Sequence, residues 1–145
     1  YSGARRGELE VLKTKNFVVD GELYIIHTIG KGDKERTLYI PKKYIEDEIS
    51  YYIANDIEFI VTTKSGKIMD GSQIYRFLNN TYRKIGIKYS GAHILRHTFA
   101  KSMIAKDVNI VTVKELLGHA NIQTTMIYTN PNQREVQKAY LDTMK

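Results

Sequence analysis

Short runs of predominantly apolar and β-forming residues lie between residues 17 and 40, with the run 23–29 rich in Tyr, Ile and Thr, and two turn signals separate these runs. The first signal is Asp20-Gly21, and an Asp-Gly pair favours the tight turn of a β-hairpin. The second is the Gly-Lys-Gly-Asp sequence at 30–33, after which a third run ends at Pro41. The pattern predicts a three-stranded antiparallel meander over residues 17–40.

The segments on both sides of the meander have the period of a helix. Leu9 and Leu12 predict a short helix over residues 5–12. A helix that begins near residue 42 is predicted from an apolar stripe of Ile45, Ile49, Tyr52 and Ile53. Further helices are predicted over residues 72–85, 92–106, 109–117 and 121–127, with a last one starting at Asn130-Pro131. This order of elements predicts an α+β fold that is mainly helical and contains one small antiparallel sheet.

Capping residues mark several of the predicted helix ends. Ser72 is expected to be the N-cap of its helix, and Gly86 is expected to end it. Asn109 is expected to cap the following short helix, and Gly118 to stop it. The buried face of the helix over 92–106 is expected to contain Leu95, Phe99 and Met103.

Composition narrows the class of protein. The 145 residues are enough for one domain with its own core, and the formal net charge of +6 suits a polyanionic partner. The absence of cysteine excludes disulfides, cysteine-zinc sites and thiol nucleophiles. No apolar run approaches the length of a membrane span and no signal peptide is present, which favours a cytoplasmic protein. The chain starts without methionine inside a patterned segment, so we expect a fragment with material missing upstream.

Two histidines, an arginine and a tyrosine lie within residues 93–128. His93 and Arg96 are three residues apart, so on a helix they share one face. His119 follows a glycine that looks like a helix stop, and Tyr128 comes nine residues later. A hydroxyl nucleophile among cationic donors is the composition of a phosphoryl-transfer site without a metal. Each residue also has an ordinary alternative, since His119 suits a helix C-terminus and Tyr128 is one of 11 tyrosines.

Further basic candidates lie in the first 36 residues. Arg5 is either a functional cation or a surface arginine that pairs with Glu8 three residues on. Lys31 lies between two glycines at the expected hairpin tip, and Lys34 and Arg36 follow it. These three cations form either a solvated basic turn or a mobile arm that reaches a nucleic-acid backbone, where Lys31 could donate a proton.

Two other chemistries lack their usual residues. No pair of carboxylates lies next to the histidines, which argues against a zinc site. No glycine-rich phosphate loop ending in Lys-Ser or Lys-Thr is present, so the sequence does not predict an ATPase. We therefore expect neither a metal nor a cofactor.

Four motifs, in chain order, resemble those of the tyrosine recombinases, the phage-integrase and Xer-like family of site-specific DNA recombinases. They are Gly3-Ala4-Arg5-x-x-Glu8-Leu9, Gly30-Lys31-Gly32-x-Lys34-x-Arg36, His93-x-x-Arg96-His97, and Leu117-Gly118-His119 with Tyr128 nine residues on. The resemblance covers nearly the whole chain, and it implies the catalytic-domain fold of that family.

The resemblance implies a catalytic role for six residues. Tyr128 would attack a DNA phosphate and form a 3′-phosphotyrosyl bond, without metal or ATP. Arg5 and Arg96 would clamp the non-bridging oxygens, and Lys31 would protonate the leaving 5′-oxygen. The remaining two, which would donate hydrogen bonds or carry the tyrosine proton, are His93 and His119.

The same resemblance implies partners and boundaries. Double-stranded DNA would be the substrate, contacted also by Lys34 and Arg36. The helix from Pro131 resembles a C-terminal segment that packs on a neighbouring subunit, which implies a homotetramer on DNA and leaves a monomer open for the free protein. The family's core-binding domain and the leading helix of its catalytic domain are not in residues 1–145, which are expected to be a single catalytic domain. The open alternatives are a type IB topoisomerase-like enzyme and a non-catalytic DNA-binding module.

Overall fold

The computed structural model describes residues 1–30, 32, 34–88, 91–119, 121, 123–127, 137 and 140–143. The chain divides into two compact units, residues 1–99 and residues 100–145, and each is described by itself. The expectation that residues 1–145 form a single domain stays a prediction. Among the described residues, no helix is both long and apolar enough to cross a membrane.

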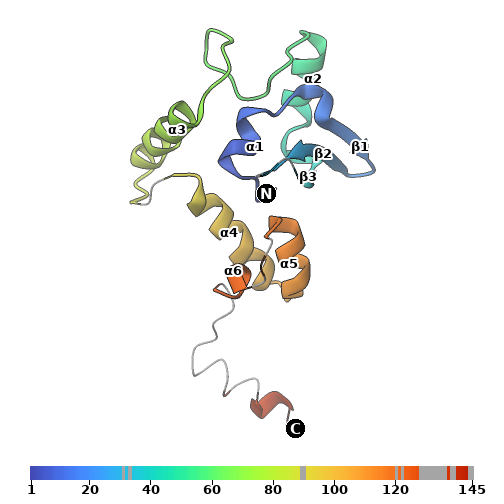
Figure 1. Ribbon diagram of the computed structural model, residues 1–145, viewed down its shortest axis with the longest axis vertical. Helices are drawn as coiled ribbons and strands as arrows, with labels where there is room; N and C mark the ends of the chain where they lie inside the picture. Colours follow the sequence, from blue (N-terminus) through green and yellow to red (C-terminus); the bar gives the residue numbers. More distant parts are fainter. Residues whose placement is uncertain are drawn as a thin grey trace. The chain divides into compact units, whose positions relative to one another are not determined.

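The first unit contains a three-stranded sheet with strand order β1-β2-β3 (Figure 1). The strands are β1 (Phe17–Asp20), β2 (Leu23–Ile29) and β3 (Glu35–Pro41), and both pairings are antiparallel. In the register of the sheet, Ile26 of β2 lies opposite Phe17 on one side and Leu38 on the other. The predicted meander is confirmed.

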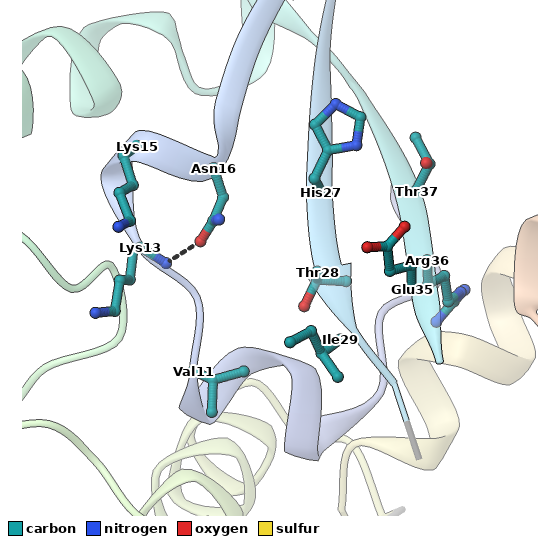
Figure 2. A pocket seen from close by; sticks show the side chains of 10 residues that line it. All are labelled: Val11, Lys13, Lys15, Asn16, His27, Thr28, Ile29, Glu35, Arg36 and Thr37. Carbon is teal, nitrogen blue, oxygen red and sulfur yellow. Dashed lines mark hydrogen bonds between the residues drawn. The ribbon is translucent and has the colours of Figure 1, made fainter. Parts of the chain in front are cut away.

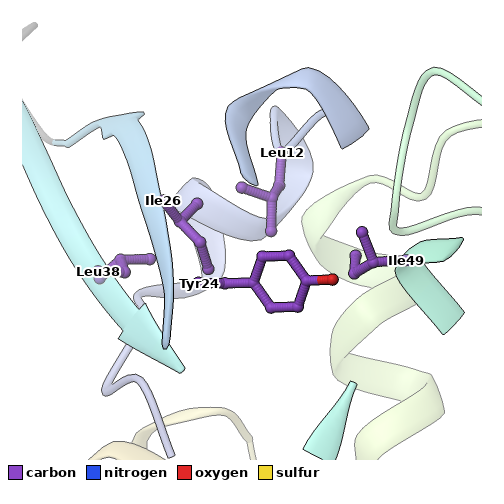
Figure 3. Packing of buried hydrophobic residues seen from close by; sticks show 5 residues of the cluster. All are labelled: Leu12, Tyr24, Ile26, Leu38 and Ile49. Carbon is purple, nitrogen blue, oxygen red and sulfur yellow. The ribbon is translucent and has the colours of Figure 1, made fainter. Parts of the chain in front are cut away.

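One face of the sheet forms the core of the first unit. Tyr24, Ile26 and Thr28 alternate along β2 as its buried positions, because successive side chains of a strand point to opposite faces. Figure 3 shows the Tyr24 ring extending from the sheet toward Ile49. The buried cluster consists of Leu12, Tyr24, Ile26, Leu38 and Ile49.

The first unit also contains helices, and Ile49 of one of them belongs to this core. They are α1 (Arg6–Glu10), α2 (Glu46–Ala54) and α3 (Gly71–Lys84), with the 3-10 turns Thr14–Asn16 and Lys42–Tyr44 and the start of α4 (His93–Ile104). The predicted N-cap of α3, Ser72, is wrong. Asp70 caps the helix instead: its carboxylate accepts from the Gln73 N–H at 2.8 Å, and the Gln73 side chain accepts from the Asp70 N–H at 3.0 Å. This reciprocal capping box satisfies two terminal N–H groups, which a cap at Ser72 would not.

The second unit contains α5 (Ile110–Leu117) and α6 (Gln123–Met126). Both predicted ends of α5 are confirmed: the Asn109 side chain accepts from the Val111 N–H at 2.8 Å, and Gly118 has the left-handed conformation, with φ 60°. Of the expected buried face of α4, Phe99 is buried, whereas Leu95 is 53% exposed and was assigned wrongly. The start of the last predicted helix, at Asn130-Pro131, lies outside the described residues.

Candidate active site

A buried carboxylate, that of Glu8, organises the N-terminal arginine motif. Glu8 is 2% exposed and lies in the first turn of α1. Its Oε2 accepts a hydrogen bond of 2.6 Å from the backbone N–H of Arg5, and its Oε1 lies 3.5 Å from Nη1 of the Arg5 side chain. One carboxylate therefore holds both the backbone and the guanidinium of Arg5, and it also satisfies a terminal N–H of the helix.

Arg36 of β3 binds the same carboxylate from the sheet. Its Nη1 donates to both oxygens of Glu8 at 2.6 Å, and its Nη2 donates to the Gly3 carbonyl oxygen at 3.4 Å. Burial lowers the pKa of Arg36, and the adjacent Glu8 carboxylate opposes that shift. Because the Arg36 side chain is only 7% exposed, its charge is directed into the protein.

The Gly3 carbonyl also anchors the second arginine motif. Nη1 of Arg96, on α4, donates to the Gly3 oxygen at 2.5 Å, although the two residues are 93 positions apart in the chain. Arg96 is 7% exposed, and Arg5 lies two residues after Gly3 in the chain. The first unit thus gathers three guanidinium groups around one carboxylate and one backbone carbonyl. Three positive charges face one negative charge, so the cluster has a net charge of +2.

Helix α3 fixes the chain immediately before α4. The buried Tyr82 hydroxyl donates to the Gly91 carbonyl at 3.1 Å, and the Asn79 side chain accepts from the Gly91 N–H at 2.8 Å. Gly91 has φ 75°, and a Cβ there would lie 3.3 Å from the Tyr75 ring. These contacts hold the residue that lies two positions before the start of α4, where His93 is exposed and Arg96 follows one turn later.

The basic residues of the β2–β3 hairpin do not share one environment. Lys34 is exposed, as expected of a residue that contacts DNA, whereas Arg36 faces Glu8. The expectation that Arg36 contacts DNA stays a prediction, and the structure disfavours it because the buried guanidinium is paired with the buried Glu8 carboxylate. Lys31 lies outside the described residues.

His119 is held within the second unit by a contact that the sequence did not reveal. His119 follows Gly118, which has the left-handed conformation, and the backbone N–H of His119 donates to the Lys114 carbonyl at 3.1 Å. Its Nδ1 lies 2.8 Å from the hydroxyl oxygen of Thr125, a fully buried residue of α6. Either atom can be the donor of this hydrogen bond. Tyr128, which follows α6 in the chain, lies outside the described residues.

A separate hollow of about 800 Å³ lies between the Lys13–Asn16 segment and the edge of the sheet (Figure 2). Its lining mixes both signs of charge, and Lys13 is paired with Glu58 at 2.6 Å. Thr28 presents a buried hydroxyl there that has no hydrogen-bond partner among the described residues. The hollow shares Arg36 with the arginine cluster but is lined by neither Arg5 nor Arg96, and its cations Lys13 and Arg36 are paired with Glu58 and Glu8. The cluster is therefore the candidate active site.

The cluster has the chemistry of an anion-binding site. Guanidinium groups donate from a rigid planar fork that matches phosphate oxygens, and they stay charged at any working pH. Arg5 remains 32% exposed although Glu8 holds it, so its side chain can contact a ligand at the surface. The described residues contain no group of three or more histidine, aspartate or glutamate side chains that could hold a metal ion.

Comparison with known proteins places this chain in a family. The profile of the Phage integrase family matches residues 1–135. Tyrosine recombinase XerH of Helicobacter pylori is 30% identical over 149 aligned residues, which cover 96% of this chain and 41% of that protein. The fold is that of tyrosine recombinase catalytic domains, and the chain belongs to the phage integrase family.

Two solved structures carry the fold assignment. A crystal structure of the XerH site-specific recombinase bound to its difH substrate, in a pre-cleavage complex, matches with a TM-score of 0.82 and 27% identity, covering 97% of this chain and 43% of that one. A crystal structure of the XerA recombinase matches with a TM-score of 0.77 and 32% identity, covering 100% and 55%. The predicted fold class is confirmed. The chain spans about two fifths to half the length of the curated relatives it matches.

Proposed function

We propose that this chain is the catalytic domain of a site-specific DNA recombinase that cuts and rejoins DNA through a 3′-phosphotyrosyl intermediate. The observation that carries the proposal is the convergence of Arg5 and Arg96 near the Gly3 carbonyl, since Arg96 donates to that oxygen and Arg5 lies two residues beyond it. Two arginines that act on one phosphate need a shared frame, and Gly3 and Glu8 supply it.

The proposed reaction is a transesterification at phosphorus. The hydroxyl oxygen of Tyr128 attacks the phosphorus, a tyrosyl–phosphate bond to the 3′ side forms, and the bond to the 5′-oxygen breaks. Lys31 gives a proton to the leaving 5′-oxygen, and Arg5 and Arg96 stabilise the charge on the non-bridging oxygens. The phosphodiester energy is kept in the protein–DNA bond, so another 5′-hydroxyl can reverse the step without ATP or a metal.

The two histidines of the proposed site act on the same phosphate. His93 lies at the exposed first position of α4, one turn before Arg96, and donates a hydrogen bond to a phosphate oxygen. When the Thr125 hydroxyl donates to Nδ1 of His119, the neutral imidazole carries its proton on Nε2 and can donate it to the phosphate. In the other tautomer, Nδ1–H donates to the Thr125 hydroxyl, and the free Nε2 accepts the proton that Tyr128 loses when it attacks.

The proposed partner is double-stranded DNA, in the cytoplasm. XerH is bound to its difH substrate in its crystal structure, and the net charge of +6 of this chain suits the same class of ligand. Lys34 supplies an exposed cation near the hairpin. We also propose a homotetramer on DNA, formed by exchange of the segment that follows Pro131 between subunits, and a monomer when DNA is absent.

Covalent trapping tests the proposal. The chain is incubated in EDTA with nicked duplexes, first one carrying difH and then a pool with randomised arms, and protein-linked DNA is recovered after denaturation. Wild type and Tyr51→Phe, a control at an exposed tyrosine of α2, should both form the adduct. Tyr128→Phe should bind DNA equally well and form none.

The other outcomes identify the alternatives. An adduct that persists in Tyr128→Phe would show that another group is the nucleophile. DNA binding with no adduct from the whole pool would identify a non-catalytic DNA-binding module. Adduct formation and supercoil relaxation without exchange between two duplexes would identify a type IB topoisomerase-like enzyme.

A further inference from the structure

The β2–β3 hairpin is joined to the arginine motifs at its base. A Cβ added at Gly30 would lie 3.5 Å from Oε1 of Glu8 and 3.7 Å from Nη1 of Arg5, so Gly30 lies beside that ion pair. The Gly30 N–H donates to the Lys34 carbonyl at 2.8 Å, which closes the base of the hairpin. The residue after Gly30 is Lys31, the proposed proton donor.

Arg36 is the side chain that ties this hairpin to both motifs at once. From β3 it binds both oxygens of Glu8 at 2.6 Å, and through Glu8 it is connected to the backbone and side chain of Arg5. Its Nη2 and Nη1 of Arg96 donate to the same oxygen, that of Gly3. A carbonyl oxygen has two lone pairs, so it can accept both arginines.

We infer that Arg36 is a positioning residue of the proposed active site, which holds Arg5 through Glu8 and fixes the Gly3 carbonyl that receives Arg96. It touches no substrate in this role. The inference rests on the proposed function, because positioning is defined here by the cleavage step. It replaces the DNA-contacting role that the sequence suggested for Arg36.

The position in the sheet explains why an arginine is required. Arg36 lies opposite Thr28 in the register, on the same face as Leu38, so its side chain enters the protein beside the core and not the solvent. A lysine there could neutralise Glu8 but, as a point donor, could not match the fork that binds two oxygens of Glu8 and the Gly3 carbonyl together. A misplaced Arg5 or Arg96 would then lose alignment with the phosphate.

The experiment compares Arg36→Met, which removes the charge but keeps much of the volume, with Arg36→Lys, which keeps a cation next to Glu8. Arg83→Met, at an exposed arginine in the last turn of α3, is the matched control. The readouts are the rate of covalent adduct formation at saturating DNA, and the dependence of DNA affinity on salt. Arg36→Met should reduce the rate on the order of 100-fold, Arg36→Lys should reduce it less, and neither should change the salt dependence.

A double-mutant test separates positioning from folding. If Arg36 acts through Arg5, then Arg36→Met should reduce the rate far less in an Arg5→Lys background than in wild type. The pair Glu8→Gln with Arg36→Met removes both buried charges, so its thermal unfolding should be closer to wild type than that of Arg36→Met alone, while its cleavage should remain slow. Arg36→Lys supplies the kinetic comparison if Arg36→Met does not fold.

Each outcome decides between the two claims. An adduct from wild type at a rate that both Arg36 variants match would overturn the inference and leave the proposed function intact. A salt dependence that weakens in Arg36→Met would restore the DNA-contacting role and overturn the inference. No adduct from wild type on any duplex would overturn the proposed function, and the inference with it.

Discussion

His119 and Thr125 are joined by a hydrogen bond of 2.8 Å between the imidazole Nδ1 and a fully buried hydroxyl. The contact connects the second residue after α5 with the short helix α6, which precedes Tyr128 in the chain. A bond from one imidazole nitrogen sets the orientation and the tautomer of the ring, and so determines what the other nitrogen can donate. Thr125 is therefore expected to set the orientation and the tautomer of the His119 ring.

The first prediction concerns Thr125→Val, which keeps the shape of the side chain but removes the hydroxyl. We expect the rate of covalent adduct formation to fall about 100-fold, the lower end of the range for a positioned proton donor, because the imidazole itself remains. Thr125→Ser keeps the hydroxyl and should retain most of the rate. Equal rates in Thr125→Val and wild type at every pH between 6 and 9 would show that the contact does not matter for catalysis.

The second prediction concerns the cap of α3. Asp70→Ala removes the acceptor for the Gln73 N–H and should lower the free energy of unfolding by about 1 kcal/mol. Ser72→Ala is the matched control, because Ser72 is an exposed residue of the first turn and its loss should change stability by less than about 0.5 kcal/mol. Urea unfolding of both variants measures the difference, and a larger loss in Ser72→Ala would contradict the observed cap.

Local signals were sufficient for several elements of the fold. Asp20-Gly21 placed the first hairpin turn, and Asn109 and Gly118 placed both ends of α5, because the physical requirement at each of these positions involves only neighbouring residues. The N-cap predicted for α3 was wrong for a related reason. Asp70 and Ser72 are both good N-caps, and only Asp70 has Gln73 at the third helical position to complete a capping box.

The candidate site was only partly accessible from the sequence. Motif residues identified Arg5 and Arg96, but their common anchor is a backbone oxygen, and the Gly3 carbonyl leaves no signal in the sequence. Arg36 was predicted to contact DNA, although the period of two along β3 places it on the same face as Leu38 and Ile40. Arg36 is two residues before the buried Leu38, so the alternation of a strand puts its side chain on the buried face of the sheet.

The third prediction concerns Tyr82, whose pKa is raised by burial. The unfolded chain releases the Tyr82 proton near pH 10, and the folded protein keeps it to a higher pH. This contribution to stability is therefore fully present below pH 10 and is lost as the pH rises through the folded pKa. Tyr82→Phe removes the titration and the hydrogen bond to Gly91, so below pH 10 it should be less stable by about 0.5–1.5 kcal/mol.

Unfolding of wild type and Tyr82→Phe between pH 8 and pH 11 checks this sign. The difference between the two proteins should shrink above pH 10, because only wild type loses the Tyr82 contribution. The contributions of the other titrating groups to stability are common to wild type and Tyr82→Phe, so they cancel in the difference. A difference that is constant over the whole range would mean that Tyr82 titrates alike in the folded and unfolded chains.

The fourth prediction uses the contrast between Lys34 and Arg36. A cation that contacts a DNA phosphate releases a counterion, so the slope of log affinity against log salt depends on how many such contacts are made. Lys34 is exposed, and Lys34→Ala should reduce the magnitude of that slope by about 0.9, the value for one phosphate contact. The charge of Arg36 is held by Glu8, so Arg36→Met should leave the slope unchanged.

Lys64→Ala, at an exposed lysine in the turn before Gly66, controls for the general loss of positive charge. Affinities are measured by fluorescence anisotropy between 50 and 300 mM salt on one duplex. If Lys34→Ala and Lys64→Ala change the slope equally, the effect is a property of the net charge and Lys34 makes no particular contact. If Lys34→Ala alone changes it, the hairpin contributes a phosphate contact through Lys34, while the arginine two residues later serves the interior of the same site.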